Sequence, residues 1–329
     1  MSLPSGVKRP LGATPDRSPG SVRRSSHIDM VWLPAEGVVA GPGTVLVLRA
    51  GARDVATGWD GRGRVVAEAA LTAELGPGNR IERLETVPAV AGVDDLVGRV
   101  AGQGFRGAAR RVVAEHSEEP LGLLLDDLPV AALISGYGPL RSGALTSSLE
   151  PGGERLGYMR DLCSGWRSEG VMMASIERGE GVPIPDLAPA PDLSRPDDPL
   201  ASEAMSPLPG GSLRRMRRID VLAGEPVRIE AMFRDTYAGP GGQEGVLHEY
   251  AVGVTVDDGR VADIEAEPRV LPWPECPAAA DHVRRLVGAA VGNLAADVPA
   301  TLSGIASCTH LNDLLRSLSS VPRLTRLRP

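Results

Sequence analysis

The sequence predicts an α+β protein made by tandem duplication, in which each copy forms a small antiparallel sheet covered by helices. The first observation is a set of short motifs that recur in the same order in both halves of the 329-residue chain. They are His27-Ile-Asp29, Arg53-Asp54, Arg80-Ile81 and Leu96-Val-Gly98, then Arg218-Ile-Asp220, Arg234-Asp235, Arg260-Val261 and Leu286-Val-Gly288. The second observation is that strand-like segments precede helical ones in each half, as in α+β layer pairs.

Four regions follow from this pattern. Residues 1–22 are polar and rich in Pro, Ser, Gly and Arg, which predicts a disordered tail. Residues 23–136 form the first, degenerate copy, and residues 211–325 form the second. The connector between them, residues 137–210, is rich in Pro and Gly and contains one expected helix at Glu154–Trp166. A connection of this length is typical of a linker or of a lid over a site.

The first copy contains two expected strands, Val45–Arg49 and Arg64–Thr72, whose residues are apolar or alternate in polarity. A helix interrupted by glycines is expected at Asp94–Val113. The apolar stretch that begins at Pro120 predicts a buried helix.

The second copy has the clearest pattern. Its expected strands are joined by a hairpin turn at Asp257-Asp-Gly259. Proline directly after Cys276 favours a helix start, because the first helical turn tolerates proline. The expected strands are Glu225–Asp235, His248–Val256 and Arg260–Glu267, and the expected helices are Cys276–Val287, Leu294–Leu302 and Thr309–Leu318.

Composition excludes several classes of function. A net charge of -7 and an aromatic content of 3% argue against a nucleic-acid-binding protein. Lys8 is the only lysine, which argues against Schiff-base chemistry. No apolar run approaches the roughly 20 residues of a membrane span, and no secretory signal is visible. Three cysteines without a signal favour a cytoplasmic protein with reduced thiols, and a homo-oligomer is compatible with the sequence.

The reactive side chains are confined to the second copy. His248 begins a strand, Cys276 begins a helix, and Cys308 and His310 stand at the start of the last helix. Two imidazoles and two thiols suit a divalent metal, zinc first, with iron or an iron–sulfur cluster as the alternative. The competing interpretation is that the cysteines are small apolar core residues.

Three further residues are candidates for catalysis beside this metal. Glu249 is the candidate general base, Arg234 the candidate anchor for an anionic group, and Asp235 lies next to it. The alternative for Glu249 is a strand glutamate paired with an arginine. Because Arg53-Asp54 repeats the Arg234-Asp235 pair, a structural ion pair is the alternative for Arg234 and Asp235.

Two resemblances follow from these motifs. The segments Val-Leu-His248-Glu, Pro-Glu-Cys276-Pro and Ser-Cys308-Thr-His310-Leu resemble an uncharacterised bacterial family marked by a Cys-Thr-His-Leu motif. The hairpin before Cys276, with Cys308 opening the last helix, is more distantly similar to iron–sulfur scaffold proteins of the IscU/NifU type. That resemblance implies that Cys276 and Cys308 match two scaffold cysteines, whereas the first scaffold cysteine is missing here.

Together these features predict a metal-dependent enzyme acting on a small organic molecule, a lyase, isomerase or hydrolase of bacterial metabolism. The metal would polarise a carbonyl group or activate water. The alternatives are a non-enzymatic metal or iron–sulfur carrier, and a metal-free enzyme with a Cys308 thiolate and His310.

Overall fold

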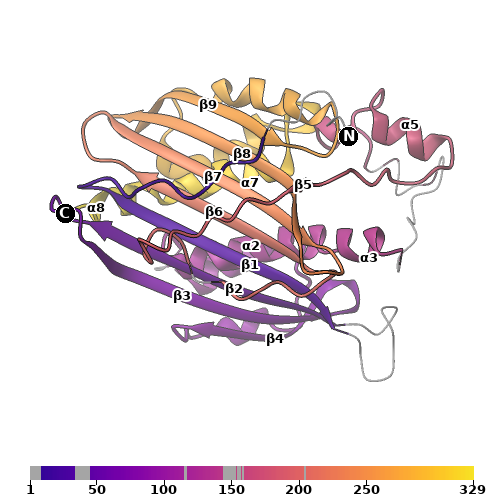
Figure 1. Cartoon of the computed structure of the whole chain (residues 1–329), viewed down its shortest axis with the longest axis horizontal. Helices are drawn as coiled ribbons and strands as arrows, with labels where there is room; N and C mark the ends of the chain where they lie inside the picture. Colours follow the sequence, from indigo (N-terminus) through magenta and orange to yellow (C-terminus); the bar gives the residue numbers. More distant parts are fainter. Residues whose placement is uncertain are drawn as a thin grey trace.

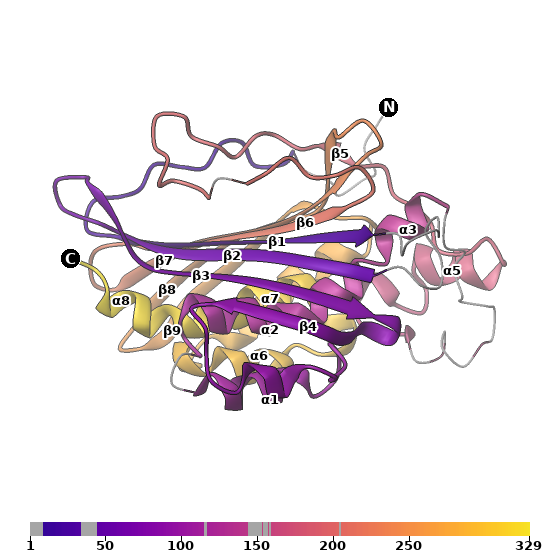
Figure 2. The same cartoon turned by 90° about the horizontal axis from the view of Figure 1, so that it is seen from below.

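One antiparallel sheet of nine strands runs through both halves of the chain in the computed structural model, which describes residues 9–33, 45–114, 117–143, 153, 157, 159–203 and 205–329. Helices cover one face of this sheet, and two irregular chain segments cross the other (Figures 1 and 2). The prediction of an α+β fold is confirmed. The two small sheets expected from the sequence are instead one continuous sheet.

The strand order of one half mirrors that of the other. The order is β4-β3-β2-β1-β6-β7-β8, with β5 and β9 both paired to β8. The two halves join where β1 pairs with β6 antiparallel, from Val22 opposite Val221 to Met30 opposite Leu213. The strands are β1 Val22–Leu33, β2 Val45–Thr57, β3 Gly63–Gly76, β4 Arg80–Val87, β5 Ala188–Pro189, β6 Leu213–Val221, β7 Val227–Ala238, β8 Glu244–Asp257 and β9 Arg260–Val270.

Reciprocal ion pairs hold the junction between β1 and β6. Arg23 of β1 donates to Asp220 of β6 at 2.5 Å, and Arg214 of β6 donates to Asp29 of β1 at 2.6 Å. All four side chains are largely shielded from solvent. Each half contributes four strands in matching order, and each central strand supplies the arginine of one ion pair and the aspartate of the other. The junction is therefore approximately two-fold symmetric.

The helices follow the strands in each half. The first half contains η1 Pro77–Asn79, η2 Val93–Leu96, α1 Phe105–Val112, α2 Pro120–Ile134 and α3 Tyr137–Arg141. The connector contributes η4 Ser164–Trp166 and α5 Val171–Glu177. The second half contains η5 Cys276–Leu286, η6 Val291–Asn293, α6 Leu294–Thr301, η7 Gly304–Ala306, α7 Thr309–Ser317, η8 Leu318–Ser320 and α8 Val321–Arg326.

Three helix predictions need correction. The expected helix Asp94–Val113 is split, because Gly98 and Gly104 have φ angles of 83° and 82°, which end regular helix. The helix that begins at Cys276 is present but has 3-10 geometry. The expected helix Glu154–Trp166 lies partly outside the described residues, and its described end is the short turn η4.

The helix α2 is apolar on all sides because it packs inside the protein. The segment Pro120–Arg141 is long and apolar enough to cross a membrane, but 67% of its most apolar window is buried. Leu124, Leu125 and Leu128 belong to an apolar core between α2 and the first four strands. A second core lies between β6–β9 and the C-terminal helices. This arrangement is compatible with a soluble protein.

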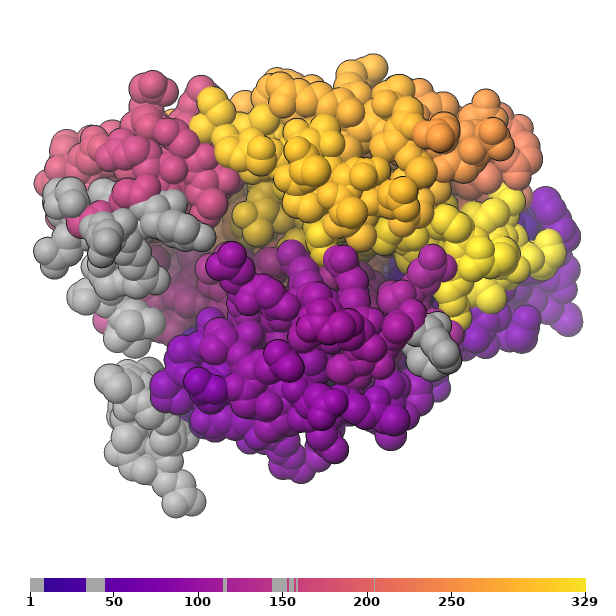
Figure 3. Space-filling view, turned by 180° about the vertical axis from the view of Figure 1, so that it is seen from behind, coloured from indigo at the N-terminus to yellow at the C-terminus, as the bar shows by residue number. Residues whose placement is uncertain are grey.

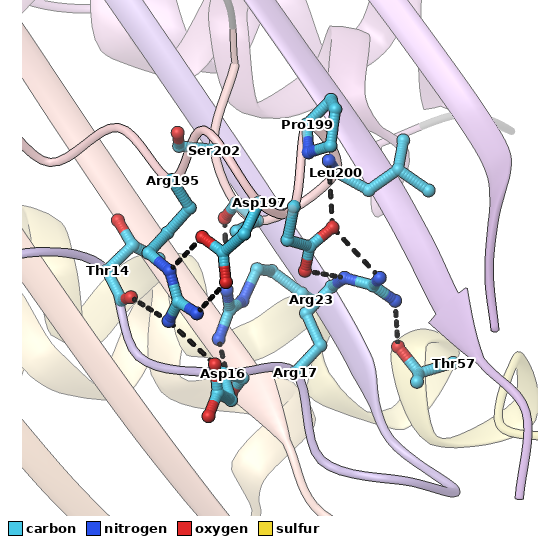
Figure 4. Close-up of polar contacts among 12 residues, drawn as sticks. Thr14, Asp16, Arg17, Arg23, Thr57, Arg195, Asp197, Pro199, Leu200 and Ser202 are labelled. Carbon is cyan, nitrogen blue, oxygen red and sulfur yellow. Dashed lines mark hydrogen bonds and ion pairs between the residues drawn. The ribbon is translucent and has the colours of Figure 1, made fainter. Parts of the chain in front are cut away.

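Residues 9–21 do not form the predicted disordered tail. They lie beside residues 190–202 of the connector, across the sheet face opposite the helices (Figure 2). Arg195 binds Asp16, Asp197 and the Thr14 carbonyl, while Arg17 binds Asp198 and Thr57 (Figure 4). Ion pairs between two polar segments thus order a region whose composition alone predicts disorder.

Candidate metal centre

The sheet and the last long helix bring two histidines to one aspartate. Asp235 on β7 is directly opposite His248 on β8, so both side chains project to the helix-covered face. A bulge follows Asp235, where the pairing register shifts before Thr236. The helix α7 begins at Thr309 and packs on β7, which places His310 in its first turn above the same aspartate.

Two imidazole nitrogens face the same carboxylate oxygen. His248 Nδ1 lies 3.4 Å and His310 Nε2 lies 3.6 Å from Asp235 Oδ2. The three ligand atoms lie within 4.8 Å of one another, the only such group of His, Cys, Asp and Glu side chains among the described residues. Metal bonds of about 2.1 Å at tetrahedral angles separate their donor atoms by about 3.4 Å, so these spacings fit a metal site.

Neither nitrogen has a hydrogen-bond partner within the described parts of the chain. Both His248 Nδ1 and His310 Nε2 are shielded from solvent, and the two rings stack with centroids 3.6 Å apart and planes at 20°. Buried polar atoms normally have partners, and an orphaned one commonly marks a function or a bound ion. The donor set therefore has the chemistry that a metal ion would satisfy.

The charges around the cluster suit a cation. Burial opposes ionisation of Asp235, but the adjacent Arg215 guanidinium lowers its pKa below the usual range. Burial, together with the neighbouring His248, lowers the pKa of His310 well below 6.5. An ionised carboxylate and a neutral imidazole are the protonation states required for metal coordination.

Arg215 links this cluster to a second carboxylate. It binds Asp235 through Nε at 2.9 Å and Nη2 at 3.1 Å, and its Nη1 lies 3.1 Å from Asp313 Oδ2. All three side chains are buried. Neither Arg215 nor Asp313 was predicted from the sequence as a site residue. The signal for Arg215 was the repeated pair Arg23-Arg24 and Arg214-Arg215, since Arg24 makes the corresponding bond to Asp54.

The predicted cysteines lie beside the cluster rather than in it. Cys308 Sγ is 3.8 Å from His310 Nδ1, the ring nitrogen that faces away from Asp235. The Tyr250 hydroxyl donates to the Cys276 carbonyl oxygen at 3.5 Å. The part of the connector around Cys163 reaches this region, because the Ser164 N–H bonds to the Ser307 carbonyl, directly before Cys308.

These thiols are in apolar surroundings that disfavour their ionisation. Burial raises the pKa of Cys308, raises that of Cys276 well above 9, and raises that of Cys163 to about 11. A position at a helix start, such as those of Cys276 and Cys308, by itself lowers the pKa of a thiol. Desolvation outweighs that effect here, because both side chains are buried.

Arg234 and Glu249 are on the opposite face of the sheet from the histidines. Their side chains form a fully buried ion pair with each other. Glu249 Oε1 also accepts the Leu11 backbone N–H at 2.6 Å, and Arg234 donates to the Leu11 and Pro191 carbonyls. The prediction of Glu249 as a general base and Arg234 as an anion anchor beside the metal is therefore corrected. Strand alternation directs both side chains away from the histidines, and they bind the two segments that cross the opposite face of the sheet. Asp235, by contrast, is part of the cluster.

The connector is divided between the two faces. Its Ser164 N–H donates to the Ser307 carbonyl at 2.9 Å, next to the start of α7. Residues 190–202 cover the other face, around Arg234. Among the described connector residues, those around Cys163 are the candidates for the predicted lid, because they contact the start of α7.

Comparison with known proteins gives a family of unknown function. Residues 213–323, which carry all the residues of the cluster, match the family described as "Protein of unknown function (DUF2889)". No curated protein matches the chain. A solved structure, "Crystal structure of lipopolysaccharide binding protein", aligns over 78% of this chain and 87% of that chain at 10% identity, with a TM-score of 0.13, which supports no argument.

Proposed function

We propose that this protein binds one divalent metal ion through Asp235, His248 and His310 and uses it to act on a small organic molecule. The observation that carries the proposal is that two buried, unpartnered imidazole nitrogens face one ionised carboxylate. Without a metal, the same groups could form at most weak hydrogen bonds to Asp235 at 3.4 and 3.6 Å.

Three protein ligands favour catalysis over a purely structural role. Structural zinc sites generally use four protein ligands, whereas catalytic sites leave one position for water or substrate. The imidazole side chains of His248 and His310 are 10% and 16% exposed, while Asp235 is fully buried, so the approach is from the imidazole side. When bound, the metal would polarise a carbonyl group or activate water.

The ligand types restrict the metal but do not select one. Imidazole suits zinc, iron and copper, and a site with two histidines and one carboxylate also occurs with non-haem iron. Zinc is our first choice because two histidines and one carboxylate are a ligand set of catalytic zinc sites. The three free cysteines fit a reducing compartment, and we extend the proposal to a cytoplasmic protein.

The two alternative functions receive less support. An iron–sulfur carrier needs exposed thiolates, whereas Cys276 and Cys308 are buried with raised pKa values. The same raised pKa of Cys308 disfavours a thiolate nucleophile. The likeness to iron–sulfur scaffold proteins and to a Cys-Thr-His-Leu family stays a prediction.

We also infer that the two halves arose by duplication and that the second half retained the site. The support comes from matching backbone hydrogen bonds. The Ile81 N–H donates to the Arg99 carbonyl, and the Ile81 carbonyl accepts from the Gly98 N–H. Val261 makes the same two bonds to Ala289 and Gly288. Arg80 and Arg260 likewise donate to the carbonyls of Gly98 and Gly288.

Metal analysis of protein purified without chelators tests the proposal. We expect about one ion per chain, and its loss in His248→Ala, since a two-ligand site binds weakly. His282→Ala, which changes a half-exposed histidine on η5, is the matched control and should retain the metal. Wild-type protein that holds no metal and binds neither Zn²⁺ nor Fe²⁺ after reconstitution would overturn the proposal.

A second measurement separates a catalytic from a structural metal. In the cobalt-substituted protein, azide should change the visible absorption spectrum if a coordination position is open. A spectrum that does not respond to azide or imidazole would indicate a closed site and would contradict the enzyme assignment while leaving the metal assignment intact.

A further inference from the structure

A cavity of about 190 Å³ lies where the helices of the two halves meet. Its walls come from α1 and α2 on one side and from α6, α7 and η8 on the other, along the seam visible in the space-filling view (Figure 3). Four arginines line it, Arg24, Arg106, Arg110 and Arg316, against only two carboxylates, Glu118 and Asp126. The protein as a whole carries a net charge of -7, so this concentration of positive charge is local.

One carboxylate is shared by three of these arginines. Asp126 lies 2.9 Å from Arg316, 3.3 Å from Arg106 and 3.3 Å from Arg110. Burial opposes its ionisation, but the charges of Arg106 and Arg316 lower its pKa, so it is an anion. Glu118 is turned toward Arg326 at 3.4 Å. Outside the cavity, Arg24 is bound to Asp54 at 2.6 Å and Arg106 to Asp313 at 2.8 Å. Arg110 and Arg316 share Asp126, so the described side chains leave an excess of one positive charge at the cavity.

Arg316 is fixed at the cavity wall by two partners. Its side chain is 8% exposed, its Nη2 binds Asp126, and its Nη1 donates to the Ala295 carbonyl at 2.5 Å. Its buried Nε has no hydrogen-bond partner among the described residues. An orphaned, buried donor of a charged group at a cavity wall is expected to have an acceptor when the site is occupied.

We propose that this cavity binds a small organic anion through Arg110 and Arg316. Their one unbalanced positive charge matches an anionic group, and guanidinium groups bind carboxylate and phosphate oxygens through paired N–H donors. The remaining walls are apolar, formed by Ala109, Val113, Leu123 and Ala295, which suits a short carbon body. The volume corresponds to about six water molecules, so the ligand is small. The proposal does not depend on the metal centre.

Isothermal titration of the full chain with two probes, malonate and inorganic phosphate, tests this site. We expect at least one probe to bind at one site per chain with an affinity that falls as salt is raised, because the interaction is between charges. Tighter binding of malonate would identify a carboxylate ligand, and tighter binding of phosphate a phosphorylated one. Failure of both to bind at about 10 mM, well above a millimolar Kd, would overturn the proposal.

A charge reversal locates the binding. Arg110 is 45% exposed and its only carboxylate contact among the described residues is at 3.3 Å, so Arg110→Glu should fold and weaken binding by about tenfold or more. Arg284→Gln, which removes a charge on η5 that is 67% exposed, should bind like wild type. Equal binding by Arg110→Glu and wild type would place the anion elsewhere and overturn the proposal. Arg316→Gln should lower the binding affinity further if the variant folds, but the result for Arg110→Glu is the one that tests the proposal.

Discussion

Two aspartates in corresponding positions of the sheet have different neighbours, and the difference defines the site. Asp54 on β2 is held by Arg24 at 2.6 and 2.8 Å and by Arg323 of α8 at 3.1 Å. Asp235 on β7 is held in the same way by Arg215. Both carboxylates are fully buried. The shared part of the arrangement is therefore an aspartate neutralised by one buried arginine of the central strand.

The remaining neighbours distinguish the two halves. Asp54 is paired across the strands with Ala67, whereas Asp235 is paired with His248. A second permanent cation, Arg323, completes the first cluster, and the neutral imidazole of His310 completes the second. Two guanidinium groups would repel a metal cation, whereas a neutral imidazole offers it a lone pair. The same scaffold thus gives an ion cluster in one half and a metal-type donor set in the other.

The largest expected effect is on stability, at the ion cluster of the first half. Asp54→Ala would leave Arg24 and Arg323 buried without a carboxylate, and we expect a loss of about 3–5 kcal/mol in the free energy of unfolding. Urea unfolding measures it. A loss below about 1 kcal/mol would show that this cluster is not structural and would break the comparison.

The next effect concerns metal affinity. His310→Ala should weaken metal binding by more than about 100-fold, because the loss of an outer-shell partner alone costs about 10–100-fold. Arg323→Ala, at the corresponding side of the first cluster, should leave metal affinity unchanged. Competition with a chromophoric chelator measures both, and equal losses in the two variants would contradict separate roles for the halves.

A smaller effect concerns pH in the metal-free protein. The folded pKa of His310 lies below its unfolded value of 6.5, so below that pH the unfolded chain takes up a proton that the folded protein does not. The free energy of unfolding should therefore be constant above about pH 6.5 and fall below it, by up to about 1.4 kcal/mol per pH unit. His310→Gln should remove most of this slope in urea titrations at pH 7.5, 6.5 and 5.5. An unchanged slope in that variant would assign the pH dependence to other groups.

The smallest effect is expected from transplanting one histidine. Ala67→His puts an imidazole across from Asp54, as His248 stands across from Asp235. Because Arg24 and Arg323 remain, we expect no additional metal to bind. A second equivalent of metal in this variant would show that the arginines do not determine the difference.

The sequence predicted individual strands and helices better than the way in which the two halves are joined. Strand alternation and the turn Asp257-Asp-Gly259 predicted β7, β8 and β9 but not β6, and the start of α7 at Thr309 was placed correctly. The pairing of β1 with β6 was not predicted, because contact between residues about 190 positions apart leaves no local pattern. The order of residues 9–21 was missed for the same reason, since their partners are in the connector.

Two of the four side chains predicted as metal ligands lie in the Asp235 cluster. The structure brings His248 and His310 together there, whereas Cys276 and Cys308 lie outside it. Metal binding itself stays a prediction. Strand alternation could have separated Glu249 from His248, because neighbouring residues of a strand face opposite sides. The raised pKa values of the cysteines depend on burial between the connector and η5, which composition does not reveal.

X-ray absorption spectroscopy of the zinc-loaded protein tests the central claim most directly. The account predicts nitrogen and oxygen ligands at about 2.0–2.2 Å, multiple-scattering features from two imidazoles, and no sulfur at about 2.3 Å. In His310→Ala one imidazole contribution should be missing. A sulfur shell in the wild-type spectrum, or a spectrum unchanged by His310→Ala, would contradict a centre formed by Asp235, His248 and His310.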